Sequence, residues 1–258
     1  MQGKIEELFS FECEAMIWET ALDPTTGRLL LQTRNEEKHE TAFSIVDLHT
    51  GQWILRDKQF EESWWIGISA IKSNRALLHI YEDDQNPELK SIILWDIEHD
   101  HVLATYENTT LVRVLEGGFQ VRKEDGLHTM DWEGLAIKDL PETNPALADN
   151  TSVYHPFQYQ SGDDDFDTIS SFIVQGMNVT PEAGAEYLET DEYIFISYYI
   201  NEHKMLANYL LISDLVGEIL FTKKINASAK GMGRDTFFIF ERKLVFISNN
   251  NSLSVYAI

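Results

Sequence analysis

Short runs of apolar or alternating residues, separated by polar turns, constrain the fold of this chain more than any other feature. The runs are about four to nine residues long and are rich in Ile, Val, Phe, Tyr, Trp and Thr, which suit a pleated sheet. Long segments with the helical period of 3.6 residues are nearly absent. The sequence therefore predicts an all-β chain. Representative runs are Arg28–Thr33, Ala76–Tyr81, Tyr193–Ile200 and Leu244–Ser248.

A turn motif recurs between these runs. An apolar strand ends in Asp, a turn follows, and a second apolar strand begins, as it does at Asp47, Asp96, Asp131 and Asp214. Asp can accept hydrogen bonds from the turn backbone, and Gly can adopt the positive φ that closes a hairpin. The intervals between successive aspartates are 49, 35 and 83 residues. A unit of roughly 40 residues with four strands is the blade period of a β-propeller, so the repeat predicts that fold.

Five blades are expected, with six as the alternative, because the longest interval between the aspartates holds either an insertion or an extra blade. We assign the insertion to about residues 141–182, where Pro141–Pro156 is polar and typical of a loop. The expected blades are Glu14–Leu55, Trp64–Tyr106, Leu111–Leu140, Ala185–Lys224 and Gly231–Ile258.

A short helix is expected inside the insertion, over about residues 163–176. Apolar residues recur there at helical spacing, acidic residues precede them, and Gly176 stands where a helix would stop. The apolar residues of this segment are Phe166, Ile169, Phe172 and Ile173.

The N-terminal segment is expected to complete the last blade. That blade contains only three good strands, and an incomplete blade leaves an unpaired edge. Ile5–Glu12 alternates like a strand and has no other partner in the chain. We therefore predict that it forms the outer strand of the last blade and closes a single propeller domain spanning residues 1–258.

The charge and the cysteine count exclude several classes of protein. With 20 Lys and Arg against 43 Asp and Glu, the net charge is −23, which argues against binding to nucleic acids or to anionic membranes. No apolar stretch has the length of a signal peptide or a membrane span, so we expect a cytoplasmic protein. Cys13 is the only cysteine, which excludes an intrachain disulfide and indicates a buried thiol.

Several segments resemble an uncharacterised bacterial family of domains of unknown function with a propeller-like repeat of the quinoprotein or WD40 type. The resemblance extends over most of the chain and implies a cytoplasmic β-propeller with no known activity. The tryptophan pattern of quinoproteins is only partly present, so no quinone or other cofactor is expected. The segments are Phe60–Gly67, Leu77–Tyr81, Asn86–Glu88, Glu186–Glu189 and Ile196–Tyr199.

Motifs for familiar site chemistries are incomplete. Gly67–Ile71 is one glycine short of a nucleophile elbow and lies within a predicted strand. Lys230–Arg234 is glycine-rich and basic, but a strand rather than a helix follows it. His99–His101 occupies a hairpin turn, and the acidic run Asp163–Asp167 lacks the glycine and terminal glutamate of a calcium loop. We therefore expect no metal site.

The candidate binding residues are aromatic, with two polar neighbours. Trp64 and Trp65 would point to opposite faces of a strand, as would Tyr198 and its neighbour Tyr199, while His79 and Tyr81 would share one face. The predicted ligand or partner residues are Trp64, Trp65, His79, Tyr81, Glu186 and Tyr198.

The leading functional hypothesis is a non-enzymatic binding or scaffold module for a protein or a small ligand. Propellers present loops from every blade around a channel, and the strong acidity favours a basic partner or simple solubility. The alternative is an enzyme of the glycoside hydrolase type, which would need two carboxylates at a defined separation. Its candidate residues are Glu14, Glu19, Glu186, Glu189 and Asp235.

Overall fold

The computed structural model describes residues 5–82, 90–137, 153–229 and 231–258. Within these ranges the chain is all-β with a single helix, which confirms the predicted fold class. The chain divides into two compact units, which we call unit 1 (Met1–Glu14 and Ser152–Ile258) and unit 2 (Ala15–Thr151). The arrangement of all blades in one ring, and hence the single domain, stays a prediction.

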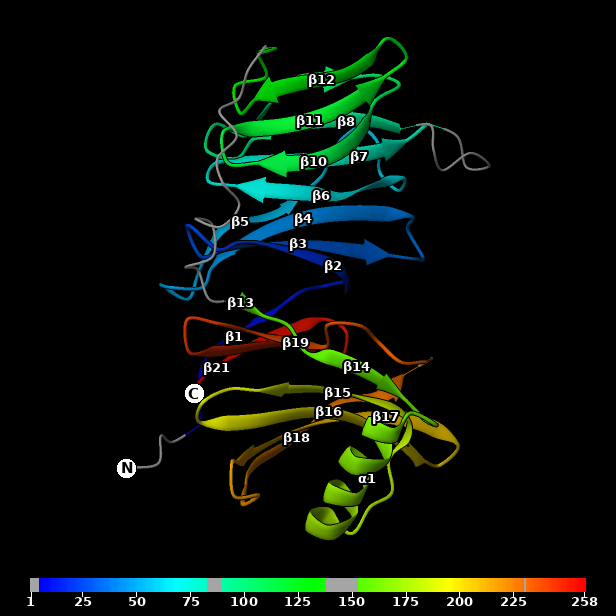
Figure 1. Cartoon of the computed structure of the whole chain (residues 1–258). Coiled ribbons are helices and arrows are strands. Elements are labelled where there is room, and N and C mark those ends of the chain that lie inside the picture. Colours follow the sequence, from blue (N-terminus) through cyan, green and yellow to red (C-terminus); the bar gives the residue numbers. More distant parts are fainter. Residues whose placement is uncertain (1–4, 83–89, 138–152, 230) are drawn as a thin grey trace. The chain divides into compact units, whose positions relative to one another are not determined.

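Unit 2 contains three antiparallel sheets, each a simple meander of consecutive strands (Figure 1). The first sheet is β2 (Met16–Asp23), β3 (Arg28–Asn35), β4 (Glu40–Asp47) and β5 (Gln52–Lys58). The second is β6 (Ile66–Lys72), β7 (Arg75–Tyr81), β8 (Lys90–Asp96) and β9 (His101–Tyr106). The third is β10 (Thr110–Leu115), β11 (Gly118–Lys123) and β12 (Gly126–Asp131). These sheets match the first three predicted groups of strands, including the short third one.

The recurring aspartates close the hairpins as predicted. Asp47 Oδ1 accepts hydrogen bonds from the backbone N–H groups of His49 (2.7 Å) and Thr50 (3.0 Å). Each of the other three aspartates also accepts two backbone N–H groups of its own turn through one oxygen. The motif is therefore a local device that reverses the chain between strands.

The second sheet is apolar on both faces because it has a sheet packed on each side. Leu78 and Trp95 contact the first sheet at residues such as Phe43. Leu77, one position earlier on β7, contacts Phe119 of the third sheet. Leu77, Leu78 and Trp95 of the second sheet are fully buried. Phe119 on β11 and Phe43 on β4 are fully buried as well. Successive side chains along β7 therefore point to opposite faces of the sheet and enter two different hydrophobic cores.

Unit 1 contains two five-stranded antiparallel sheets (Figure 1). The fourth sheet is β14 (Phe157–Gln160), β15 (Glu182–Glu189), β16 (Tyr193–Glu202), β17 (Met205–Asp214) and β18 (Ile219–Ala229). The fifth is β1 (Glu6–Glu12), β21 (Ser252–Ala257), β20 (Lys243–Ser248), β19 (Phe237–Phe240) and β13 (Val153–Tyr154). Phe195 and Leu210 of the fourth sheet pack on Phe237 of the fifth.

The N-terminal strand pairs as the sequence predicts. β1 runs antiparallel to β21, with Glu6 opposite Ala257 and Glu12 opposite Ser252. Beyond the strand, the Cys13 backbone N–H donates to the carbonyl of Asn251 at 2.9 Å, and the Cys13 thiol is buried. The pairing of first and last strands is thus confirmed, whereas closure of a whole ring is not tested by it.

The predicted helix is present as α1 (Asp164–Met177), with Phe166, Ile169 and Ile173 buried. It ends slightly later than expected, because Asn178 adopts the left-handed conformation at φ 55° and donates its N–H to the Val174 carbonyl. α1 packs against the face of the fourth sheet that carries Ile196 and Tyr198. It is too short and too polar to cross a membrane, and the described residues contain no other helix.

The expected insertion contains more strand than the sequence suggested. β13 pairs with β19, and β14 pairs with β15, so residues 153–160 supply edge strands to both sheets of unit 1. Two short strands beside prolines carry little periodic signal, which explains why this segment resembled a loop. Most of the predicted loop Pro141–Pro156 lies outside the described residues.

Candidate functional site

Polar and aromatic side chains gather in unit 2 where the first two sheets meet. Glu19 on β2 lies opposite Gln32 on β3, and Arg34 follows on the same face of β3. The Gln32 amide donates to the Ile66 carbonyl at 3.1 Å and so joins β3 to β6. We call the resulting group the Arg34 cluster. Its members are Trp18, Glu19, Arg34, Trp64, Ser69, His79 and Tyr81.

Arg34 lies between two indole rings. Its guanidinium carbon is 4.7 Å from the Trp18 ring centre and 5.2 Å from the Trp64 ring centre. The Nε atom is buried without a hydrogen-bond partner, and among the described residues no hydrogen bond of the guanidinium is found. Burial lowers the pKa of Arg34, opposed by the charge of Glu19, and the group remains cationic. Trp18 is 55% exposed, so one wall of this cation site faces solvent.

Trp64 and Trp65 lie before β6 rather than on it, which differs from the strand that we expected. Glu62 Oε1 accepts the backbone N–H groups of Trp64 (2.8 Å) and Trp65 (2.7 Å), and these bonds hold a turn. Trp64 contacts Arg34 and the edge of His39. Trp65 is 45% exposed, and its carbonyl accepts the N–H of Tyr81.

His79 occupies space that a glycine leaves open. Gly67 lies opposite His79 in the β6–β7 pair, and a Cβ on Gly67 would be 2.7 Å from two imidazole atoms. The ring reaches Ser69, whose Oγ is 3.0 Å from His79 Nδ1. The rings of His79 and Tyr81 meet edge to face with centres 5.0 Å apart, which confirms that they share a face. The sequence analysis considered Gly67 and Ser69 only as an incomplete nucleophile elbow and did not predict their contact with His79.

The Ser69–His79 pair is poorly suited to nucleophilic catalysis. Burial lowers the pKa of His79 to about 4, with a further contribution from the charges of Lys90 and Arg34. The imidazole is therefore neutral at pH 7 and a weak base. Ser69 lies within β6, where the chain lacks the sharp strand-to-helix turn of a nucleophile elbow. The pair instead offers neutral hydrogen-bonding groups beside Arg34.

Glu19 is the carboxylate of the Arg34 cluster. Loss of surrounding water raises its pKa, opposed by a hydrogen bond to the Ile68 backbone and by the charge of Arg34. Of the five acidic residues considered for glycoside hydrolysis, Glu19 alone belongs to this cluster. Of the two groups that a two-carboxylate mechanism needs, the candidates named from the sequence therefore supply one in the described part of this cluster.

Glu186 and Tyr198 lie in the interior of unit 1. Glu186 is 1% exposed, and its Oε2 accepts the Thr236 backbone N–H at 3.0 Å and also the Thr236 hydroxyl. Burial raises the pKa of this carboxyl, against the hydrogen bonds from Thr236. Tyr198 is fully buried and stacks on Tyr209. Both residues hold the fold, and neither presents a surface to a ligand.

The basic glycine-rich stretch offers no phosphate cradle within its described part, which excludes residue 230. The Gly233 N–H donates to the Tyr199 hydroxyl at 2.8 Å, so this amide is already used. The strand β19 follows, as expected, and no helix begins there.

The histidines at the β8–β9 turn have an additional neighbour that the sequence analysis did not consider. Ligand atoms of Asp96, His99 and His101 lie within 4.8 Å of one another. Asp96, however, already contacts Arg75 at 3.1 Å and His99 Nδ1 at 2.9 Å, and it accepts two turn amides. These bonds account for the buried carboxylate without a metal.

Comparison with protein families supports the resemblance to a family of unknown function. A family model described as "Domain of unknown function (DUF4905)" matches residues 22–103, within unit 2. The match includes Arg34, Trp64 and His79 but not the segment around Glu186, so it covers less of the chain than expected. No curated protein sequence matches the chain.

Solved structures similar to the chain at low identity include a β-propeller domain. Raptor from Chaetomium thermophilum is 9% identical with a TM-score of 0.40, and the match covers 98% of this chain but 28% of Raptor. The β-propeller domain of the Trilobed protease from Pyrococcus furiosus is 14% identical with a TM-score of 0.31, over 93% of this chain and 81% of that domain.

Proposed function

We propose that this protein is a binding module on a β-propeller scaffold, and that its Arg34 cluster binds a small molecule carrying one carboxylate or phosphate group. The observation that carries the proposal is the half-buried Arg34 guanidinium, held between two indoles with no hydrogen bond among the described residues. The five-bladed ring closed by β1 is the scaffold that we propose for it.

An anion satisfies what the cluster lacks. A guanidinium has five N–H donors in a planar fork that matches a carboxylate or phosphate. Stacking on Trp18 and Trp64 fixes the plane of the fork but supplies no acceptor. A bound anion would therefore pair the charge in a site that is already arranged for it.

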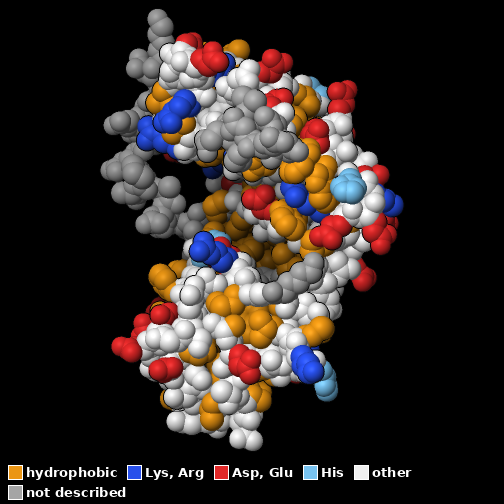
Figure 2. Space-filling view, turned by 90° about the vertical axis from the view of Figure 1, so that its right-hand side faces the viewer, with side chains coloured by type: hydrophobic (Ala, Val, Ile, Leu, Met, Phe, Trp, Pro, Cys, Tyr) orange, Lys and Arg blue, Asp and Glu red, His pale blue; other side chains and the backbone are white. Residues whose placement is uncertain are grey.

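The surrounding groups limit the ligand to a small molecule. Acidic side chains are scattered over the face shown in Figure 2, and the net charge of −23 repels polyanions. Glu19 beside Arg34 disfavours a second acidic group on the ligand and favours a ligand that also carries a hydroxyl or amine donor. Trp18 offers an exposed face to a flat part of the ligand.

A fluorescence titration tests this function, because two tryptophans flank Arg34. The probes are benzoate, lactate and glycerol phosphate, with benzyl alcohol as the uncharged control. We expect at least one anion to bind, and Arg34→Ala to weaken it at least tenfold. Arg56→Ala is the matched control, since Arg56 also stacks on an indole, 4.9 Å from the Trp53 ring centre, outside the cluster. Equal affinity of wild type and Arg34→Ala would contradict the proposal.

A further inference from the structure

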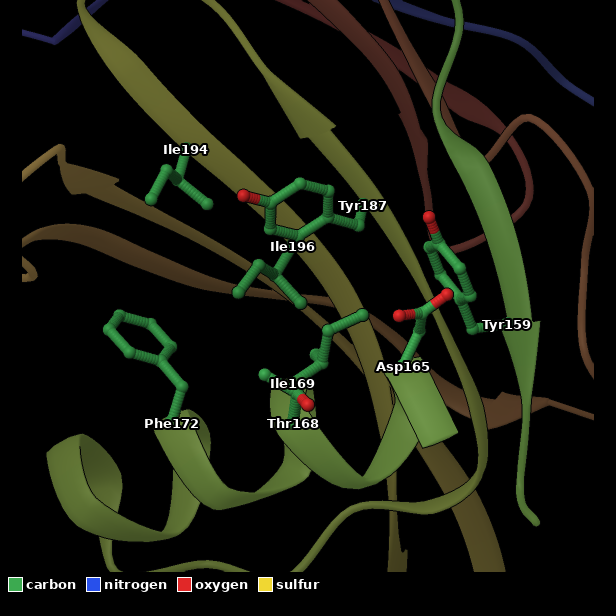
Figure 3. Close-up of a pocket in the computed structure, with 8 residues that line it drawn as sticks. All are labelled: Tyr159, Asp165, Thr168, Ile169, Phe172, Tyr187, Ile194 and Ile196. Carbon is green, nitrogen blue, oxygen red and sulfur yellow. The ribbon is translucent and has the colours of Figure 1, made fainter. Parts of the chain in front are cut away.

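A pocket of about 280 Å³ lies in unit 1 between α1 and the fourth sheet. Its walls come from β14, α1, β15 and β16, so both the helix and the sheet are needed to form it (Figure 3). The lining residues are Tyr159, Asp165, Thr168, Ile169, Phe172, Tyr187, Ile194 and Ile196. None of them belongs to the Arg34 cluster, and none was singled out as a binding residue from the sequence.

One end of the pocket is apolar. Figure 3 shows Phe172 and Ile194 at this end, with Ile169 and Ile196 between it and the other end. Ile169 and Ile196 are buried in the core under α1, which fixes the floor. An apolar group placed here would remove further apolar surface from water, so this end favours a hydrocarbon or aromatic ring.

The other end of the pocket is negatively charged. Asp165 lies beside Tyr159 in Figure 3, and among the described residues its carboxylate has no hydrogen bond or ion pair. Asp165 lies in the first turn of α1, where a negative charge interacts favourably with the helix dipole. The Tyr187 hydroxyl points away from Asp165, toward Ile194, and donates to Glu189 Oε2 at 2.5 Å, so the Glu189 carboxylate lies outside this end of the pocket. No Lys or Arg is among the lining residues.

We propose that this pocket binds a small aromatic amine. The ring would lie on Ile169 and Ile196, and the ammonium group would pair with Asp165. Tyr159 and Tyr187 add aromatic faces that attract both a ring and a cation. The volume is near the lower limit of ligand pockets, about 300 Å³, so a single or fused bicyclic ring is the size that fits.

Isothermal titration of the full chain with tryptamine tests the proposal. Indole-3-propionate keeps the ring and reverses the charge, while butylamine keeps the charge without the ring. Asp165→Asn removes the proposed partner of the ammonium. Asp164→Asn is the matched control, because Asp164 also lies in the first turn of α1 but does not line the pocket. Thr168→Trp fills the pocket from an exposed helix position and leaves the charge of Asp165 in place.

The expected result is saturable tryptamine binding that is at least tenfold tighter than binding of either other probe. Asp165→Asn and Thr168→Trp should each weaken it at least tenfold, and Asp164→Asn should change it less than threefold. Circular dichroism verifies that each variant is folded. Absence of saturable tryptamine binding, equal binding of indole-3-propionate, or equal effects of Asp164→Asn and Asp165→Asn would overturn the proposal. Arg34→Ala should leave tryptamine binding intact, so the two proposed sites can fail separately.

Discussion

The Tyr256 hydroxyl donates a hydrogen bond of 2.6 Å to Glu7 Oε2 and so links β21 to β1 across 249 residues of sequence. Lys223 Nζ donates to the same hydroxyl at 2.9 Å from β18. The bond from Tyr256 holds the pKa of Glu7 below its usual value against the opposing effect of burial, and the charge of Lys223 adds a smaller lowering. The terminal strand pair is thus fastened by side chains as well as by its backbone ladder.

Removal of residues 1–12 should destabilise unit 1 and promote self-association. The deletion takes β1 away and exposes the backbone edge of β21, which is a template for pairing with another chain. Size-exclusion chromatography with light scattering should show oligomers, and the urea midpoint should fall. Tyr256→Phe is the milder comparison, with a loss of about 2 kcal/mol for the two hydrogen bonds of the hydroxyl. A truncated chain that stays monomeric with an unchanged midpoint would contradict this role of β1.

Gly67→Ala should destabilise the protein by about 1–3 kcal/mol, because the new methyl group would overlap the imidazole of His79. Urea denaturation measures the loss. Gly231→Ala is the control, since a Cβ on Gly231 meets no atom of the described residues within 4 Å. If the two substitutions cost the same, the close packing of His79 on Gly67 is not present in solution.

His79 should make the protein less stable as the pH falls from about 6.5 to about 4. Because burial lowers its pKa from 6.5 to about 4, the unfolded chain takes up a proton in this window while the folded chain does not. The loss is up to about 3 kcal/mol once the pH is below both values. His79→Gln should show a flatter stability profile over the same window in urea titrations. Identical slopes for the two proteins would contradict a neutral, buried His79.

Glu186 should act as a structural acceptor. Glu186→Ala leaves the Thr236 N–H without this acceptor in the interior, while the Thr236 hydroxyl keeps Ser197 Oγ at 2.8 Å as its partner; the substitution should cost about 2–4 kcal/mol. Glu186→Gln keeps one oxygen acceptor and should cost about 1 kcal/mol or less at pH 7. Burial raises the pKa of Glu186, so ionisation of this carboxyl lowers the stability of the wild type as the pH rises above 4.5. Gln does not ionise, so the stability of Glu186→Gln relative to the wild type should increase with rising pH. Thermal unfolding at several pH values checks both statements.

Local sequence patterns predicted much of the fold. The aspartate turns depend on neighbouring backbone groups, the helix on its own periodicity, and the β1–β21 pairing on the need to cover an edge. The edge strands β13 and β14 were missed because they are two and four residues long and gain their order from β19 and β15. Tertiary partners, rather than local propensity, decide such short strands.

Three of the residues that were singled out from the sequence lie in one cluster. Trp64, His79 and Tyr81 meet in the Arg34 cluster. Trp64 precedes β6, while His79 and Tyr81 lie at the end of β7, and the antiparallel pairing of these strands brings the two ends together. Arg34 itself was missed, since an arginine on a strand resembles an ordinary exposed charge until its two indole neighbours are known. Glu186 carried no signal that distinguished a buried acceptor from an accessible acid. The pocket beside α1 depends on how the helix packs and was not predictable from spacing.

The most direct test of the binding function is the Arg34 Nε–H resonance in a ¹⁵N–¹H spectrum, assigned by its loss in Arg34→Lys. This buried N–H reports on the guanidinium to which it belongs, so a carboxylate or phosphate that pairs with the guanidinium should shift its signal in a saturable way. The Nε–H of Arg56 should stay in place throughout the titration. Anion binding that leaves the Arg34 signal unmoved, or an Arg34→Lys protein that binds equally well, would contradict the account.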